Sequence, residues 1–358
     1  MKILYVTRHF NHSGYVILQR LIDEKIPIAA ILLHKDDDKW RKPLLRHYLK
    51  WKYYFKCRYY NCQPLRTLNS EESLAKKNGI PIIWTDSIKS DSFYADLQKL
   101  NPDIIVLGGG WHELIPKRVF SFPPLGCINT HPSLLPEFRG TSITRWQVLH
   151  GVEKSGSTIH YVDDTFDTGG VLAQKEIAVS KNVTPQQLFY ILGKAGADTM
   201  IPLLQQFKTT GRQVPYMVEH NPEYYNYYKR WSWDIEKLKI DWHQPFRSIH
   251  FKVLANTQES FEYLGTHFRY NGRQYFLRKT TLVNLNSTQQ DFVNGLKDDS
   301  IYVYGIEKGS IILCRKNDAH GLVLETLQRH DKYYKYRRSY PANTLLKAAI
   351  NTKFKYDE

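Results

Sequence analysis

The chain has 358 residues, a formal net charge of +15 and 42% hydrophobic residues. At roughly 150 residues per domain, this length predicts about two domains, and the composition argues against collagen-like, low-complexity and disordered chains. No apolar run approaches the roughly 18 residues of a membrane-spanning helix, and the N-terminus lacks the apolar stretch of a signal peptide, so we expect a cytoplasmic protein. The positive charge favours phosphate-bearing partners, whether a nucleotide, a nucleic acid or a membrane surface.

Short apolar runs alternate with helix-like stretches in the first third of the chain. Ile3 to Thr7 and Ile28 to Leu33 are strand-like, and Gly14 to Glu24 between them has helical spacing of its apolar residues. The pattern continues through Ile80 to Trp84, Asp91 to Leu100 and Asp103 to Leu107. The last run is unbroken, as is typical of a buried parallel strand. This order predicts an open α/β sheet over residues 1–208, with ligands at the carboxyl ends of its strands.

The sequence changes in character after Lys208. Residues 209–240 include a tract rich in Tyr, Trp and Asn with little periodicity, which we interpret as a linker. Residues 241–346 hold short apolar runs between Gly and Asn residues, which is typical of a small β-rich domain. Its first expected turn is Asn271-Gly272, because these residue types suit the positive φ angles of a hairpin. Residues 347–358 are expected to form a tail.

Several common kinds of site are not favoured. The cysteines at 57, 62, 127 and 314 form no CxxC pair and no zinc spacing, so neither a disulfide framework nor a metal site is expected. Gly108-Gly109-Gly110 lacks the continuation of a dinucleotide-binding loop. Ser133 lacks the glycines of a serine hydrolase elbow.

The segment from Gly108 to Gly170 holds the candidate chemistry. Asn129 and His131 lie two apart in an extended run, so their side chains face the same way. An amide donor beside an imidazole is the pair needed to hold a carbonyl oxygen that becomes negative during acyl transfer. Asp167 is the candidate carboxylate that would hold the histidine proton and accept one from an attacking amine. Considered one at a time, each of these residues is better interpreted as an ordinary turn or core residue than as a catalytic one.

The run Asn-x-His-Pro-Ser-Leu-Leu-Pro-x-x-Arg-Gly over 129–140 is followed by Gly-Ser-Thr-Ile-His-Tyr and by Phe-Asp-x-Gly. This order resembles the folate-dependent formyltransferases, and the resemblance extends from about Lys2 to Phe207. It implies a Rossmann-like formyltransferase domain with a mostly parallel sheet, with Asn129, His131 and Asp167 as the catalytic residues. The co-substrate would be 10-formyl-tetrahydrofolate, and no metal is implied.

The same resemblance assigns the binding residues. The folate would bind against a loop that contains Gly110, Trp111, Leu114 and Ile115. A second loop, with Asp163, Asp164 and Phe166, would form the opposite wall. Apart from the resemblance, we expect His9, Arg139, Gly140 and Thr141 to contact the acceptor. From the residues alone, Arg139-Gly140 is equally suited to contacting an anionic substrate and to pinning its own loop.

The acceptor is less clearly indicated. Residues 241–346 resemble faintly the OB-like C-terminal barrel of the methionyl-tRNA and sugar formyltransferases. The tRNA enzymes carry Gly-Thr-Pro and Ala-Pro-Ile at two places where this chain has Thr7-Arg8-His9 and Thr141-Ser142-Ile143. We therefore favour an amino sugar linked to dTDP or UDP, formylated for lipopolysaccharide or other surface polysaccharide. Methionyl-tRNA stays the alternative because of the +15 charge, followed by a non-catalytic binding module and a formyl-folate hydrolase.

Residues 39–66 form the most basic stretch of the chain. They hold nine Lys or Arg, no acidic residue and eight aromatic residues. The aromatic spacing predicts an amphipathic helix with one apolar stripe. Such a helix would pack on the sheet, bind a polyanion or contact an acidic membrane surface, and the sequence leaves these alternatives open. It also leaves open whether the chain forms a homodimer.

Overall fold

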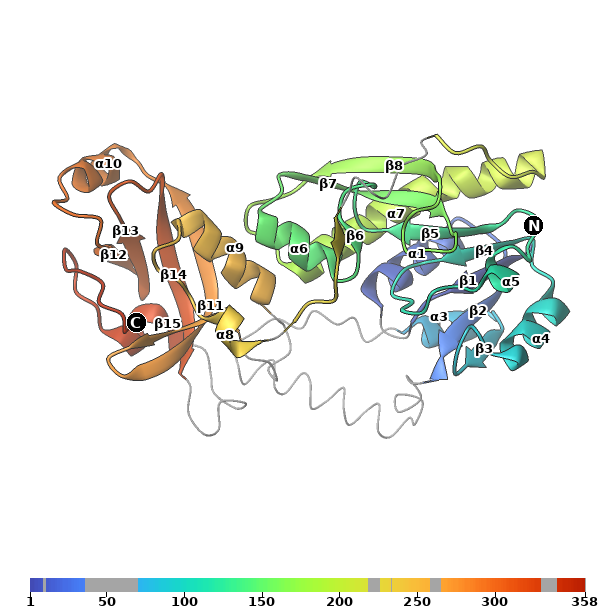
Figure 1. Ribbon diagram of the computed structural model, residues 1–358, viewed down its shortest axis with the longest axis horizontal. Helices are drawn as coiled ribbons and strands as arrows, with labels where there is room; N and C mark the ends of the chain where they lie inside the picture. The colour runs from blue at the N-terminus through green and yellow to red at the C-terminus, as the bar shows by residue number, and fades with distance from the viewer. Residues whose placement is uncertain are drawn as a thin grey trace.

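The computed structural model describes residues 1–8, 11–35, 70–217, 226–232, 234–257, 265–329 and 340–357. Figure 1 shows two domains side by side, with α6 (Ile143–His150) of the first facing α9 (Phe246–Asn256) of the second. The N-terminus lies in the first domain and the C-terminus in the second. The basic stretch 39–66 lies outside the residues that the structure describes.

The first domain is built on a seven-stranded sheet with the order β3-β2-β1-β4-β5-β7-β8. Strands β1 to β5 run parallel, whereas β7 and β8 join antiparallel at one edge. Their bounds are Ile3–Val6 (β1), Ile28–His34 (β2), Ile82–Thr85 (β3), Ile104–Leu107 (β4), Cys127–His131 (β5), Lys154–Tyr161 (β7) and Val171–Ala178 (β8). The expected Rossmann-like domain with a mostly parallel sheet is confirmed.

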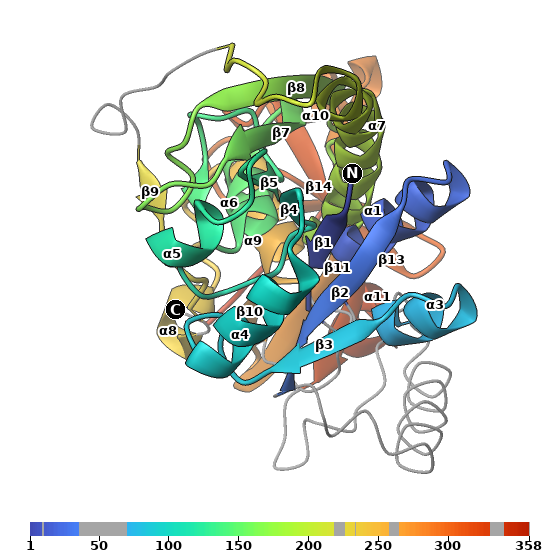
Figure 2. The same ribbon diagram turned by 90° about the vertical axis from the view of Figure 1, so that its right-hand side faces the viewer.

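Helices cover both faces of this sheet (Figure 2). One face carries α1 (His12–Asp23), α3 (Glu71–Lys77) and α7 (Pro185–Thr210), and the other carries α4 (Asp91–Leu100) and α5 (Lys117–Phe120). Successive strand residues point to opposite faces, so Ile3 and Tyr5 pack under α1 and α7, whereas Leu4 and Val6 pack under α4. Both faces of the central strands are therefore buried, which explains their unbroken apolar sequences.

The helix ends are set by local sequence. Thr184 and Gln187 form a reciprocal capping box at the start of α7, where Pro185 is the first helical residue. Gly211 ends the same helix with a φ of 62°. Ser90 caps α4 by accepting a hydrogen bond from the Phe93 N–H.

The strand order reverses between β1 and β4, which is the switch point of the sheet. In open α/β sheets the loops leaving such neighbouring strands diverge and form a crevice beyond the carboxyl ends. The segments after Val6, Leu107 and His131 meet there, and they carry most of the motif found in the sequence.

The second domain contains a six-stranded antiparallel sheet with the path β10-β11-β14-β13-β12 and β15 beside β14. Asn271 and Gly272, with φ angles of 49° and 71°, form the turn between β10 and β11. The strands are His267–Tyr270 (β10), Arg273–Asn284 (β11), Tyr302–Glu307 (β12), Ser310–Cys314 (β13), His320–Arg329 (β14) and Tyr340–Pro341 (β15); the helices besides α9 are Ile235–Leu238 (α8), Ser287–Asn294 (α10) and Ala342–Leu346 (α11).

We expected residues 347–358 to form a tail, but in the structure they pack against the second domain. Asp357 pairs with Arg269 of β10, and Lys353 pairs with Tyr302 of β12, so this segment joins the two edges of the sheet. Phe354 is 4% exposed within the domain core. Burial of this aromatic ring and pairing with both edge strands explain why the segment is held against the domain.

The segment expected as a linker also belongs partly to the first domain. Tyr227–Tyr228 (β9) pairs in parallel with Arg139–Gly140 (β6). Figure 2 shows β9 in yellow at the edge of the first domain. The domains also share an apolar cluster, in which Val148 of α6 packs with Phe251 and Leu254 of α9. Among the described helices, none combines the length and the apolar character needed to cross a membrane.

Candidate active site

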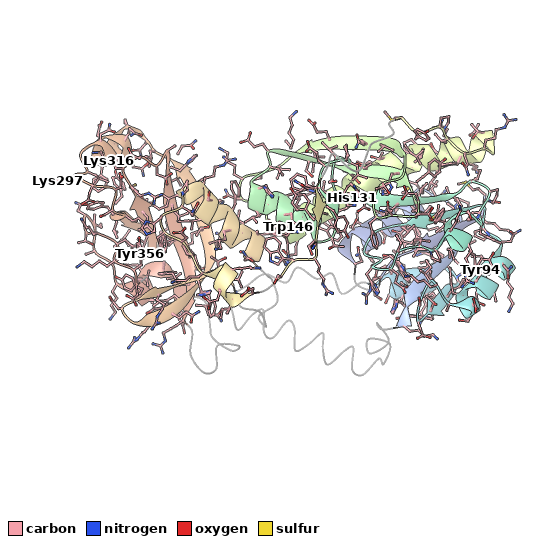
Figure 3. All side chains as sticks on the ribbon, viewed as in Figure 1. Tyr94, His131, Trp146, Lys297, Lys316 and Tyr356 are labelled. Atoms are coloured by element: carbon pink, nitrogen blue, oxygen red, sulfur yellow. The ribbon has the colours of Figure 1, made fainter. Side chains whose placement is uncertain are left out.

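Three side chains expected to be catalytic converge at the carboxyl end of β5. Asn129 and His131 project from the same face of that strand, and Asp167 reaches them from the loop after β7. The Asp167 Oδ1 atom lies 3.3 Å from His131 Nδ1 and 3.5 Å from Asn129 Nδ2. Figure 3 shows His131 within the first domain, between Trp146 and Tyr94 in this view. The structure thus brings Asp167 to Asn129 and His131, although Asp167 lies far from both in the sequence.

Asp167 is held as a carboxylate. Its Oδ2 atom accepts a hydrogen bond of 2.9 Å from the Gly140 N–H, and its backbone is left-handed with a φ of 58°. Burial alone would raise the pKa of this carboxyl, but His131, His160 and the Gly140 N–H together outweigh burial and lower the pKa to about 2. Asp167 therefore carries a negative charge throughout the physiological range.

His131 is the natural partner of that charge. Its Nε2–H donates to the Phe138 carbonyl at 2.8 Å, because a carbonyl only accepts, and its Nδ1 faces Asp167. Burial works against a charged imidazole, but the charge and hydrogen bond of the Asp167 carboxylate, together with the Phe138 carbonyl, raise the pKa of His131 above its ordinary value. When both of its nitrogens carry a proton, His131 forms a buried ion pair with Asp167.

His160 is a site residue that the sequence reasoning missed. It lies opposite Asn129 in the antiparallel pairing of β5 with β7. Its Nδ1–H donates to the Tyr161 carbonyl at 2.7 Å, so its Nε2 accepts from Asn129 Nδ2 at 3.1 Å. Burial lowers the pKa of His160 to about 4, which keeps the ring neutral and able to accept this hydrogen bond. His160 belongs to the Gly-Ser-Thr-Ile-His-Tyr segment of the motif, but only the strand register reveals its contact with Asn129.

The neutral state of His160 predicts a measurable pH dependence of stability. Its pKa of about 4 in the folded protein lies below the ordinary value of 6.5, so the unfolded chain binds a proton first as the pH falls. The contribution of His160 to the free energy of unfolding should therefore fall by about 2 to 3 kcal/mol between pH 7 and pH 4.5. Urea unfolding of the wild type and of His160→Gln at both pH values checks this. An equal loss in the two proteins would contradict it.

Arg139 and Gly140, expected at the acceptor, have clear roles in holding the site. Arg139 is 7% exposed and donates from Nη2 to the Phe166 carbonyl at 3.0 Å, which ties down the loop that carries Asp167. Gly140 has a φ of 111°, and a Cβ there would lie 2.2 Å from the Tyr228 carbonyl oxygen. Only glycine allows β9 to approach this closely while its N–H holds Asp167.

A cavity of about 610 Å³ opens beside these residues. Its lining includes Asn129, His131, Asp167 and Thr141, together with the expected folate residues Gly110, Trp111, Leu114, Ile115 and Phe166. A Cβ on Gly110 would lie 1.8 Å from Asn11 Nδ2, so the loop after β4 needs glycine there. The sequence did not indicate Arg8, Val162, Phe189 or Arg230, which also line the cavity.

Three other expected binding residues are placed differently. Asp163 lies outside the cavity lining, and its carboxylate accepts hydrogen bonds from Thr168 Oγ1 at 2.6 Å and from the Thr165 N–H at 3.1 Å, so it shapes its own loop. Asp164 is exposed and also lies outside the lining. His9 falls outside the residues that the structure describes. Within the described ranges, no group of three or more His, Cys, Asp or Glu is arranged to hold a metal ion.

Part of the first domain is similar to a known protein family. Residues 63–203 match the family model described as formyl transferase. The methionyl-tRNA formyltransferase of Syntrophus aciditrophicus is 40% identical over 126 residues, which are 34% of this chain and 39% of that protein. The corresponding protein of Bacillus cytotoxicus is 38% identical over 195 residues, which are 54% of this chain and 55% of that protein.

A solved structure aligns with nearly the whole chain. The N-formyltransferase from Helicobacter canadensis, in complex with folinic acid and dTDP-3-aminofucose, has a TM-score of 0.59 at 14% identity and covers 92% of this chain and 99% of that chain. At this identity the likeness shows the fold. The chain spans between about two fifths and just over half of the length of the first curated relatives it matches. The match of residues 63–203 to the formyl transferase model confirms the family resemblance of the motif.

Proposed function

We propose that this chain transfers the formyl group of 10-formyl-tetrahydrofolate to a primary amine. The observation that carries the proposal is the convergence of Asn129, His131 and Asp167 at one end of a cavity, with contacts of 3.3 and 3.5 Å to the same carboxylate oxygen. Amide, imidazolium and carboxylate are the groups that acyl transfer to an amine requires, because negative charge develops on oxygen while a proton leaves nitrogen.

The hydrogen bonds around Asn129 indicate how the formyl oxygen would be held. One amide hydrogen is engaged by His160 at 3.1 Å, and the other has only a long contact of 3.5 Å to Asp167. The second hydrogen can therefore turn toward a formyl oxygen at little cost, since catalytic hydrogen bonds often tighten only with substrate bound. In its protonated form, the nearby His131 would stabilise the same developing oxyanion.

Asp167 serves the proton that the amine must lose. Its carboxylate is ionised and lines the cavity, and its Oδ2 atom is held by the Gly140 N–H. As the amine nitrogen bonds to the formyl carbon, Asp167 would accept a nitrogen-bound proton directly or through a water molecule. The bond between the formyl carbon and the folate nitrogen then breaks, and that nitrogen takes up a proton.

The cavity suits a flat, partly apolar co-substrate. Leu107, Leu114, Ile115 and Val162 provide apolar surface, and the glycines at 109 and 110 expose the loop backbone for hydrogen bonding. A pterin ring offers both an apolar face and polar edges, so it fits this combination. We infer that the folate occupies this side of the cavity and that the amine enters from the side of Thr141.

For the acceptor we propose an amino sugar linked to dTDP or UDP, with surface polysaccharide as the destination of the product. Support comes from the departures at Thr7-Arg8 and Thr141-Ser142 from the tRNA-enzyme motifs, and from the dTDP-3-aminofucose named with the Helicobacter canadensis protein. A second candidate is methionyl-tRNA, because the curated relatives carry that activity in their names and the chain has a charge of +15.

Acceptor choice is tested by measuring tetrahydrofolate release from 10-formyl-tetrahydrofolate. We expect turnover with one or more dTDP- or UDP-linked 3- or 4-amino sugars and none with charged initiator tRNA. Turnover with tRNA alone, weakening steeply with salt, would replace the sugar proposal by the second candidate. Release without any added amine would indicate a hydrolase, and folate binding with no turnover would indicate a binding module.

A further inference from the structure

Arg230 is a cation at the cavity that neither the motif nor the catalytic cluster explains. It lies in the segment after β9, is exposed, and contributes to the cavity lining together with Asn129, His131 and Asp167. Its position in the sequence places it in the tract that we expected to be only a linker. We propose that Arg230 binds a phosphate group of the amine acceptor. This inference rests on the proposed function, which supplies a phosphate-bearing acceptor.

The backbone on both sides of Arg230 is fixed against the catalytic domain. The Tyr228 carbonyl accepts a hydrogen bond of 2.9 Å from the Thr141 N–H, and the Lys229 carbonyl accepts one of 2.9 Å from Trp146 Nε1. On the other side, the Trp231 N–H donates to Ser142 Oγ at 3.2 Å. The Arg230 side chain is thus presented from an ordered segment, which lowers the entropic cost of binding a ligand.

Aromatic packing fixes the same segment more firmly. The Tyr228 ring stacks on Phe138 with centroids 5.0 Å apart, and Trp231 packs edge-on against Trp146 at 4.6 Å. Figure 3 shows Trp146 on the side of the first domain that faces the second. Phe138 is also the residue whose carbonyl holds His131. The position of Arg230 is therefore coupled through one packed loop to the catalytic residues.

The charge balance of the cavity leaves Arg230 available for an anion. Asp167 is committed to His131, and the carboxylate of Glu113 accepts hydrogen bonds from Ser87 Oγ at 2.6 Å and from the Ile88 N–H at 2.9 Å. Within the part of the chain that the structure describes, no ion pair involves Arg230. An arginine offers a planar fork of donors that matches two phosphate oxygens.

Nucleoside diphosphate binding tests the assignment independently of turnover. We would titrate dTDP and UDP into the wild type, Arg230→Ala, Arg230→Lys and Lys229→Ala by calorimetry. Lys229 is a matched control, because it is an adjacent exposed cation that does not line the cavity. We expect Arg230→Ala to weaken binding about 10- to 100-fold, Arg230→Lys to be intermediate, and Lys229→Ala to bind as the wild type does.

Folate binding and thermal unfolding of Arg230→Ala should remain as in the wild type, which separates a phosphate contact from a general loss of structure. Equal nucleotide binding by the wild type and Arg230→Ala would overturn the inference and leave the sugar proposal standing.

If the wild type binds neither nucleotide but binds initiator tRNA, the proposed acceptor fails and the inference is judged on tRNA. If the salt dependence of tRNA binding by Arg230→Ala falls by about the amount expected for one phosphate contact, the inference is supported. An unchanged salt dependence would overturn the inference. Binding of none of these probes would also overturn it.

Discussion

Replacing Asp167 with asparagine is expected to lower kcat by about 100- to 10,000-fold, the range of a lost acid–base group. The substitution keeps the size of the side chain but removes the charge that raises the pKa of His131. Burial would then favour the neutral imidazole, so both the proton acceptor and the positive charge near the oxyanion would be lost. Steady-state kinetics with saturating 10-formyl-tetrahydrofolate and acceptor measures the effect.

The matched control for this prediction is Asp164→Asn. Asp164 lies in the same loop, but it is exposed and outside the cavity lining. We expect its kcat to stay within about twofold of the wild type, because exposed charges contribute little. Near-normal turnover of Asp167→Asn, with the fold confirmed by circular dichroism, would show that the carboxylate does not take part in the reaction.

Asn129→Ala is expected to lower kcat by about 100- to 1000-fold, the usual effect of removing one oxyanion donor. The KM for the folate should change much less, because the apolar walls around Leu114 and Ile115 remain in place. Single-turnover and steady-state kinetics separate the two parameters. An increase in KM with kcat preserved would assign Asn129 to ground-state binding instead.

Removal of Asn129 also leaves its neighbours without a donor. His160 Nε2 would lose its hydrogen bond of 3.1 Å, so some destabilisation is expected beside the catalytic loss. Thermal unfolding with and without folinic acid distinguishes the two effects. A variant that folds, binds folinic acid and still fails to turn over matches the catalytic role.

The sequence predicted those features that depend on local pattern. The apolar runs at Ile3 and Ile104 are buried on both faces in the structure, and such runs are typical of a covered parallel strand. The two-residue spacing of Asn129 and His131 fixed their shared direction once the strand formed. Asn271-Gly272 made the expected turn because its φ angles are a local property.

The features that sequence reasoning missed depend on long-range pairing. His160 meets Asn129 only because β7 pairs antiparallel with β5 in one register. Arg230 reaches the cavity only because β9 returns to pair with β6 across a long stretch of chain. The final segment joins both edges of the second sheet through contacts with residues far earlier in the chain. Residue composition and spacing do not predict such long-range strand pairings.

The linker and the catalytic loop form one packed unit in this structure. Gly140 donates its N–H to Asp167 and pairs with Tyr228, so the segment that connects the two domains bears directly on the catalytic carboxylate. Truncation of the chain before β9 would remove this support. A domain boundary placed at the end of α7 therefore separates residues that act together.

We propose that this site moves a formyl group from a folate to an amine. The most direct measurement follows an isotope label from the formyl carbon of 10-formyl-tetrahydrofolate by mass spectrometry, with a dTDP- or UDP-linked amino sugar as acceptor. We predict labelled N-formyl sugar in amounts equal to the tetrahydrofolate released, and none with Asp167→Asn or Asn129→Ala on the same time scale. Label recovered only as free formate, at the same rate with and without an amine, would contradict the account.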